Sequence, residues 1–289
     1  MGPGDPNSFG EPFTKRHGYV FEVPAEGVSS AQPLVDMGRF RHEATMTDPL
    51  TMATYLTEDS GEAGFYMFLP DDRRKYEAGG RLYMLAVRGQ PDFDFSSGVD
   101  PTQFPLEVEW VRIADPDPDL ETGAATCQQQ GRARGGAIFG RLEGCWWGGD
   151  VGYFASTTGG GAGQGQIFGY HPNRYSPFRG ELHLLVESSG AAVMNHPDNL
   201  VGSPNGSLIA FEDGEAPQHV VGVTPGGDVF PLLTNRCVLK GERNGIIGDF
   251  TFSETTGGCF TPDGSTLLFN MQTPGITFAV TGDWSRGCL

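Results

Sequence analysis

Four segments of the chain share one pattern, in which a short apolar strand is followed by a tight turn and a second apolar strand. The turns contain Asp-Pro, Gly-Gly-Asp, Pro-Asn-Gly and Pro-Asp-Gly, which supply the fixed or positive φ that a hairpin needs. Repeated four-stranded antiparallel units are typical of β-propellers, in which each blade buries its faces against its neighbours. The hairpins are expected at residues 42–59, 143–158, 198–213 and 257–272.

The repeats predict an all-β fold, a β-propeller of four-stranded antiparallel blades with about four blades in this chain. Residues 1–289 are expected to form a single propeller domain, complete or partial. The last repeat stops after an apolar strand at 276–280, without an outermost strand. Residues 18–23 and 34–37 read as outer strands with no hairpin before them, and one closure is for them to complete that last blade.

The excess of acidic side chains argues against nucleic acids and anionic membranes as partners. The chain has 36 acidic and 19 basic side chains, a formal net charge of −17, whereas nucleic acids and anionic membranes are bound by basic surfaces. Neither a signal peptide nor a membrane span is predicted, because no basic segment precedes an apolar run and no 18 apolar residues occur in succession. The five cysteines are scattered without a CxxC pair, which indicates idle thiols rather than a zinc site.

Acidic residues recur at the ends of the expected hairpins. The start of a blade's first strand and the end of its second lie on the same face, so these carboxylates are expected to lie close together. Crowded carboxylates need raised pKa values or cations between them, and oxygen ligands without a His or Cys motif favour Ca²⁺ or Mg²⁺. Alternatively, each acid is a solvated loop residue or a turn cap. The residues concerned are Glu43, Glu58, Asp59, Glu143, Asp198, Asn199, Glu212 and Asp213.

Arg41 stands among these acids, two residues before Glu43. It is interpreted either as their structural counter-ion or as the cation that receives an anionic substrate.

Several motifs resemble successive blocks of the PhoX-type alkaline phosphatases, in the family order and over nearly the whole chain. The resemblance implies a six-bladed propeller whose central channel holds calcium and iron ions that bind and hydrolyse phosphate esters. The blocks are MGRFRHEA at 37–44, YLTED ending at Asp59, RLEGCWW at 141–147, STTGGGAGQGQIF at 156–168, PDNL at 197–200, FED at 211–213 and CFTPDGSTLLFNMQTPGITFAVTGDW at 259–284.

The resemblance also implies roles for individual residues. Arg41 matches the phosphate-binding arginine, and Arg41 with Glu43 would be catalytic. The implied metal ligands are Glu43, Glu143, Asp198, Asn199, Glu212 and Asp213, with Glu58, Asp59 and Glu254 as secondary candidates.

Calcium is the cofactor expected from the resemblance and from the acids. In the family, a Cys-Glu-Glu-like segment whose cysteine binds iron precedes the block KRHGYVFEV. Only residues 1–14 precede Lys15 here, and none of the five cysteines stands at that position, which argues against iron. The family's first blades and export signal, which would imply a periplasmic or secreted protein, are missing as well.

The leading hypothesis is a calcium-dependent phosphatase-like propeller, which if active is a phosphoric monoester hydrolase acting on small phosphate esters. One alternative is a non-catalytic propeller that is stabilised by metal and serves as a binding or assembly module. Another is a truncated, inactive fragment, and open edge strands of such a fragment would favour self-association.

Overall fold

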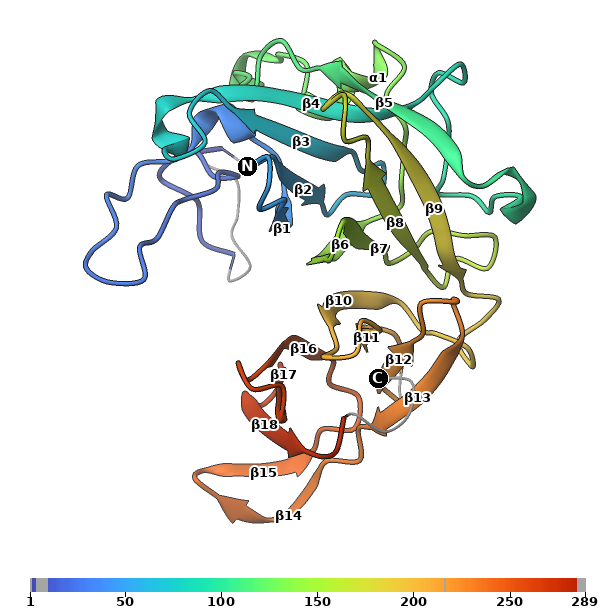
Figure 1. Cartoon of the computed structure of the whole chain (residues 1–289). Helices are drawn as coiled ribbons and strands as arrows, with labels where there is room; N and C mark the ends of the chain where they lie inside the picture. The colour runs from blue at the N-terminus through green and yellow to red at the C-terminus, as the bar shows by residue number, and fades with distance from the viewer. Residues whose placement is uncertain (1, 4–9, 216, 285–289) are drawn as a thin grey trace. The chain divides into compact units, whose positions relative to one another are not determined.

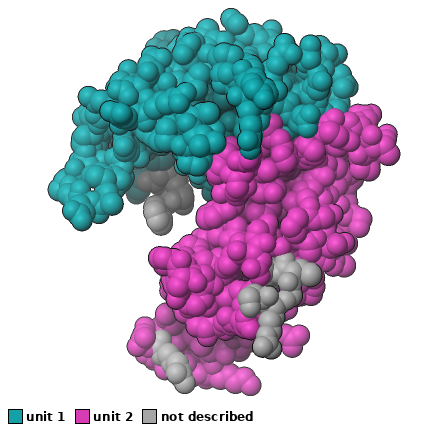
Figure 2. Space-filling view, in the orientation of Figure 1, with its two compact units in different colours: residues 1–94, 106–142, 172–181 teal, residues 95–105, 143–171, 182–289 magenta. Residues whose placement is uncertain are grey.

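A computed structural model of the chain describes residues 2–3, 10–215 and 217–284. These residues form two compact units, shown in different colours in Figure 2. Unit 1 comprises residues 1–94, 106–142 and 172–181, and unit 2 comprises residues 95–105, 143–171 and 182–289. In the described part of the chain, no helix has both the length and the apolar character needed to cross a bilayer.

Unit 1 is built around an antiparallel meander in the order β1-β2-β3-β4-β5 (Figure 1). Every residue of β2 is buried, and Leu56 packs with Tyr66, Phe68 and Met84 of the next two strands in one apolar core. The strands are β1 (His42–Thr47), β2 (Thr54–Glu58), β3 (Phe65–Pro70), β4 (Gly80–Val87) and β5 (Leu106–Arg112), and the helices are α1 (Cys127–Arg132) and the 3₁₀ turns η1 (Val35–Met37), η2 (Tyr76–Ala78) and η4 (Leu120–Thr122).

The N-terminal segment differs from expectation. Residues 18–23 and 34–37 were expected to be outer strands, but the structure has only an isolated bridge between Phe21 and Pro33 and the 3₁₀ turn η1. Leu34 and Met37 instead pack into the core of unit 1, because the backbone turns at Gly38, where φ is 97°. The prediction of strands here was wrong, since short apolar runs were read without the turns that interrupt them.

Unit 2 contains a four-stranded antiparallel meander, β10-β11-β12-β13, which is the blade expected from the repeats. Successive residues point to opposite faces, and each face is buried in a different apolar cluster. Leu208 and Ala210 pack toward β7 and β8, whereas Ile209 and Phe211 pack toward β17. The strands are β10 (Pro197–Gly202), β11 (Leu208–Glu212), β12 (His219–Val223) and β13 (Val229–Thr234).

The other strands of unit 2 are also antiparallel. Unit 2 contains β6 to β8 except for one end residue each of β6 and β8, and it contains residues 182–187 of β9. The last blade has three strands, as expected from the missing outermost strand. The elements are η3 (Pro101–Gln103), β6 (Leu142–Gly148), β7 (Val151–Ser156), β8 (Gln166–Pro172), β9 (Arg179–Glu187), β14 (Val238–Arg243), β15 (Ile246–Asp249), β16 (Thr255–Phe260), β17 (Thr266–Met271) and β18 (Ile276–Thr281).

The predicted all-β fold with propeller-like blades is confirmed by these meanders and by a structural likeness given below. Three of the expected hairpin turns contain a glycine in the left-handed region: Gly149 at φ 64°, Gly206 at φ 86° and Gly264 at φ 70°. The expectation of one domain over the whole chain stays a prediction.

Candidate functional site

Strand β1 begins with an irregularity beside Glu43. His42 pairs with Glu58 and Thr45 with Leu56, so two residues of β1 face the single residue Thr57 of β2. The Thr57 hydroxyl bonds the backbone of the bulge: it accepts a hydrogen bond from the Ala44 N–H at 2.9 Å and donates one to the Ala44 carbonyl at 3.2 Å. A bulge of this kind redirects the side chain beside it. Glu43 is exposed as a result.

Asp59 lies between two arginines at the end of β2. Its Oδ2 is 3.4 Å from Nη2 of Arg41, and its Oδ1 is 2.9 Å from Nε of Arg141. Backbone hydrogen bonds hold both arginines, from the Asp59 N–H to the Arg41 carbonyl at 3.0 Å and from the Arg141 N–H to the Ser60 carbonyl at 2.9 Å. Carboxylate oxygens of Glu43 and Asp59 lie within 4.8 Å of each other. Unit 1 therefore gathers two carboxylates and two guanidiniums in one place.

Glu58 precedes Asp59 but points into the core. Its Oε2 accepts hydrogen bonds from the Gly64 N–H at 2.9 Å and from the Tyr66 hydroxyl at 2.7 Å. Burial raises the pKa of Glu58 to about 7. Burial lowers the pKa of His42 to about 4, so this imidazole is neutral, and its Nε2–H donates a hydrogen bond to the Gly38 carbonyl at 2.9 Å.

In unit 2, an irregularity like that of β1 falls at Asp198. Pro197 pairs with Glu212 and Asn199 with Phe211, so Asp198 is the extra residue at the start of β10. The backbone of β6 touches this point, because a Cβ atom on Gly144 would lie 2.6 Å from both the Asn199 Cα and the Asp198 carbonyl oxygen. Glu143, next to this glycine, is buried. The backbone of β6 next to Glu143 therefore lies against the backbone of Asp198 and Asn199, and the metal-binding role expected for these residues stays a prediction.

Glu212 and Asp213 are neighbours in the chain but differ in burial and in hydrogen bonding. Glu212 is 1% exposed and accepts hydrogen bonds from the Asn195 N–H at 2.8 Å, the His219 N–H at 3.0 Å and the His219 ring at 3.1 Å. Burial raises its pKa. Asp213 is half-buried, and its N–H donates to the His196 carbonyl at 2.9 Å. Asp213 therefore resembles Asp59, because each follows a buried glutamate at the end of a blade's second strand.

Glu254, the remaining candidate, precedes β16 in unit 2. Its side chain is half-buried and accepts a hydrogen bond from the Gln272 amide, and its carbonyl accepts the Gln272 N–H at 3.2 Å. These contacts link the first and second strands of the last blade.

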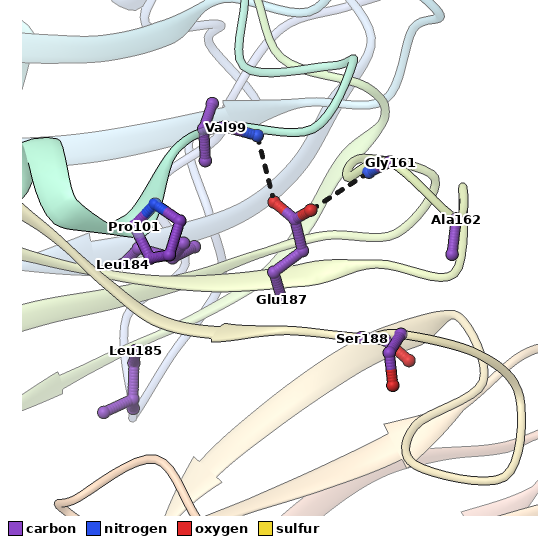
Figure 3. Close-up of a pocket in the computed structure, with 9 residues that line it drawn as sticks. Val99, Pro101, Gly161, Ala162, Leu184, Leu185, Glu187 and Ser188 are labelled. Carbon is purple, nitrogen blue, oxygen red and sulfur yellow. Dashed lines mark hydrogen bonds between the residues drawn. The ribbon is translucent and has the colours of Figure 1, made fainter.

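The glycine-rich run 159–163 forms a loop whose amide is already engaged by a carboxylate (Figure 3). Glu187 accepts hydrogen bonds from the Gly161 N–H at 3.1 Å and, through its other oxygen, from the Val99 N–H at 3.3 Å and the Gln166 amide at 2.8 Å. A phosphate bound to such a loop would use the same N–H groups. The loop is therefore a strand connection held by Glu187.

Arg141 is a candidate that the sequence reasoning missed. It lies two residues before Glu143, as Arg41 lies two residues before Glu43, and each Arg-x-Glu triplet stands at the start of a blade's first strand. The repeated triplet is visible in the sequence. The contact of Arg141 with Asp59 was not predictable from it, because the two residues are 82 positions apart in the chain.

Comparisons with known proteins agree with this fold. A solved structure of Pseudomonas fluorescens PhoX in complex with vanadate, a transition state analogue, matches with a TM-score of 0.64 and 19% identity over 92% of this chain. This chain spans 57% of the length of that PhoX chain. A candidate 6-phosphogluconolactonase of Bacteroides uniformis matches with a TM-score of 0.41 and 12% identity, over 84% of this chain and 68% of its own. No curated protein matches the sequence.

The family comparison is more direct. The family model described as alkaline phosphatase PhoX matches residues 4–275, which is nearly the whole chain. The motif blocks that resembled this family in the sequence lie within or overlap that range. The chain belongs to the alkaline phosphatase PhoX family.

Proposed function

We propose that the chain is a metal-dependent hydrolase of small phosphate esters. The observation that carries the proposal is the position of Asp59 between Arg41 and Arg141, with a carboxylate oxygen of Glu43 within 4.8 Å. Guanidinium groups bind the oxygens of a phosphoryl group through paired hydrogen bonds. Carboxylates beside them hold divalent cations, so an anionic ester and a cation are bound by the same small set of side chains.

The two arginines differ in exposure and in their contact with Asp59, and we propose different roles for them. Arg41 is 63% exposed and reaches Asp59 only at 3.4 Å, whereas Arg141 is 36% exposed and bonds Asp59 through Nε at 2.9 Å. The Nη groups of Arg141 are directed by that bond, because the guanidinium is planar. Arg141 is proposed to orient the phosphoryl group, while Arg41 closes on it after binding. Both neutralise charge that develops on its oxygens.

The donor set fits calcium. The proposed ligands are carboxylate and amide oxygens, which are hard donors that Ca²⁺ prefers over the nitrogen and sulfur ligands of zinc. Unit 1 offers one such set, Glu43 and Asp59, and unit 2 offers another, Glu143, Asp198, Asn199 and Asp213. When bound, calcium supplies a positive charge that screens these carboxylates and polarises a phosphoryl oxygen.

Glu58, Glu212 and Glu254 are proposed to support the ligands rather than to bind metal. Hydrogen bonds from neighbouring residues engage Oε2 of Glu58 and both carboxylate oxygens of Glu212, and Glu254 is bonded by Gln272. Iron is not proposed, because among the described residues the acidic group that contains Glu43 and Asp59 includes no cysteine.

Hydrolysis of p-nitrophenyl phosphate, followed with added Ca²⁺ and with a chelator, tests the proposal. We expect turnover that is lost in the chelator and restored by calcium. Asp59→Asn and Glu43→Gln should each lower kcat/KM by at least about tenfold. Glu107→Gln, an exposed carboxylate on β5, is the matched control and should keep full activity.

Two other results would contradict the proposed phosphate-ester hydrolase activity. An absence of turnover together with a calcium-dependent rise in Tm would support the metal-stabilised binding module. An absence of both would support an inactive fragment.

A further inference from the structure

Strand β18 has a free hydrogen-bonding edge in the part of the chain that the structure describes. It is the outer strand of the sheet β16-β17-β18, and it pairs with β17 from Ile276↔Met271 to Thr281↔Thr266. Outside this ladder, the described residues make no backbone hydrogen bond or β-bridge to residues 276–281. In an antiparallel strand with one neighbour, every second residue directs its N–H and C=O away from that neighbour. β18 therefore presents a row of backbone donors and acceptors to which another strand can bond.

Two neighbouring edges in unit 2 differ from β18 in composition. β13 contains Pro231, whose ring nitrogen has no hydrogen to donate to a further strand. In the hairpin β14-β15, Lys240 lies on the first strand and Asp249 ends the second. Proline and charged residues on an edge strand oppose its pairing with another sheet. The sequence of β18, ITFAVT, contains neither, so nothing in its composition opposes pairing.

The side chains of β18 alternate between a half-buried face and an exposed face. Phe278 and Val280 on the half-buried face pack against an apolar cluster that includes Phe269 of β17, and the Phe278 and Phe269 rings are stacked at 5.2 Å. Thr277 and Ala279 lie on the exposed face. A strand that joins β18 must therefore bring apolar residues to one face and small residues to the other.

The sequence of β18 is complementary to itself. A two-fold axis at Phe278 places this residue opposite its own copy, Ile276 opposite Val280, and Thr277 opposite Ala279. Opposite residues of an antiparallel pair point to the same face, so apolar residues meet apolar ones and small residues meet small ones. Moving the axis by half a residue would place Phe278 opposite Ala279 and mix the two faces. The strand therefore favours one register with a second copy of itself.

We propose that two copies of this chain associate through β18, paired antiparallel about a two-fold axis at Phe278. The two three-stranded sheets then form one continuous sheet, and both copies use the same surface, as in most homodimers. The net charge of −17 opposes association, but no charged residue occurs between Asp263 and Asp283, so the repelling charges lie outside the paired strands. This association is independent of the proposed hydrolase activity.

Sedimentation of the full chain under reducing conditions, which exclude disulfide-linked dimers, tests the proposal. One pair of strands is a small interface, so we expect a weak dimer with a Kd of about 1–100 μM. Raising the salt concentration from about 50 to 500 mM should tighten the dimer at least about twofold, because salt screens the repulsion between the copies. A monomer at concentrations up to about 300 μM, or a dimer that dissociates as salt is added, overturns the proposal.

Ala279→Lys locates the interface. The lysine would stand at an exposed position opposite Thr277 of the other copy, and we expect the dimer to weaken at least about tenfold. Ala191→Lys is the matched control, because it adds the same charge at an exposed position in the loop between β9 and β10 and should leave the Kd unchanged. Both variants should keep the Tm of the wild-type monomer. Equal Kd values in the two variants would place the interface elsewhere, and a lower Tm in Ala279→Lys alone would show that the chain's own backbone covers this edge; either result overturns the proposal.

Cysteine cross-linking tests the register, in a background in which Cys237, Cys259 and Cys288 are replaced by serine. Opposite Cα atoms of an antiparallel pair lie about 4.5–5.5 Å apart, which is within the reach of a disulfide. A mixture of Thr277→Cys and Ala279→Cys should therefore form a heterodimeric disulfide on mild oxidation. Either variant alone should cross-link less, because its two thiols lie two positions apart along the paired strands. Equal yields overturn the pairing about Phe278.

Discussion

Glu58 and Glu212 occupy equivalent positions in two blades. Each is the last residue of a blade's second strand, is at most 7% exposed, and accepts hydrogen bonds from the start of the third strand. Glu58 is bonded by Gly64 and Tyr66, and Glu212 by His219. Each carboxylate therefore closes the connection between two strands, and the residue that follows it, Asp59 or Asp213, is presented at the strand end.

Replacing Glu58 by glutamine should change how stability depends on pH. Burial raises the pKa of Glu58 from 4.5 to about 7, so between these values the folded protein binds more protons than the unfolded chain. Its free energy of unfolding consequently falls as the pH rises through that window. Glu58→Gln keeps an acceptor without the charge and should be the more stable protein above about pH 7, by at most about 3 kcal/mol.

Urea denaturation in calcium-free buffer at about pH 5 and pH 8 measures this difference. Glu107→Gln, which alters an exposed carboxylate, serves as control and should follow the wild type at both values. Parallel losses of stability with pH in Glu58→Gln and wild type would show that another group titrates.

Gly144→Ala should separate the strands that carry Glu143 and Asp198. The added Cβ would lie 2.6 Å from the Asn199 Cα, which backbone atoms can relieve only by moving apart. We expect a loss of about 1–3 kcal/mol and a smaller rise in Tm on adding calcium. Gly190→Ala is the matched control, because a Cβ there meets nothing within 4 Å. An unchanged response to calcium would argue against metal binding beside Gly144.

Arg141→Gln should impair phosphate-ester hydrolysis while leaving the fold intact. It removes a guanidinium that Asp59 fixes at 2.9 Å, and we expect kcat/KM for p-nitrophenyl phosphate to fall at least about tenfold. Arg141→Lys keeps the charge but not the planar pair of donors, so it should recover only part of the activity. Arg88→Gln, which removes an exposed guanidinium paired with Glu107, should be neutral. Full activity in Arg141→Gln would exclude the proposed role.

Phe211→Ala should loosen the packing between two blades of unit 2. The ring is fully buried, lies 5.8 Å from the Phe269 ring, and fills the space that Gly258 leaves beside β16. Its loss is expected to cost about 3–5 kcal/mol, as large-to-small changes in cores do. Phe252→Ala, where the side chain is 60% exposed, should cost far less. Thermal or urea unfolding compares the two, and similar losses would contradict the packing described.

The cysteines should differ sharply in reactivity toward Ellman's reagent. Burial raises the pKa of Cys127 to about 12 and also raises that of Cys145, so neither forms an appreciable thiolate at about pH 8. Cys259 is exposed and should react first in the native protein. The assay uses a Cys288→Ser background, since Cys288 lies outside the described residues. Rapid labelling of Cys145 without denaturant would show that its strand opens.

Strand alternation and turn residues predicted most of the blades. The hairpin expected at 198–213 is formed by β10 (Pro197–Gly202) and β11 (Leu208–Glu212), and the strand expected at 276–280 is β18 (Ile276–Thr281). β13 was missed because Pro231 interrupts its apolar run, and such a strand is recognisable only once its pairing partner is known. β5 was also missed, although its glutamates alternate with apolar residues, the pattern of a half-buried strand.

The site was predicted less completely than the blades. Acids at strand ends were found from their recurrence, but the sequence could not separate Glu58, which is turned inward, from Asp59, which faces Arg41 and Arg141. One residue's difference along a strand reverses the side chain's direction. Bulges also depend on two strands at once, so no single segment reveals them.

The extra residues at the starts of β1 and β10 have a consequence for how such a protein can change over generations. Because each bulge interrupts the alternation, the residue it presents is uncoupled from the buried positions farther along the same strand. Glu43 or Asp198 can be exchanged for another residue without refitting Met46 or Leu200 in the cores. The side chains presented at these strand starts and the stability of the blades can therefore evolve as separate traits.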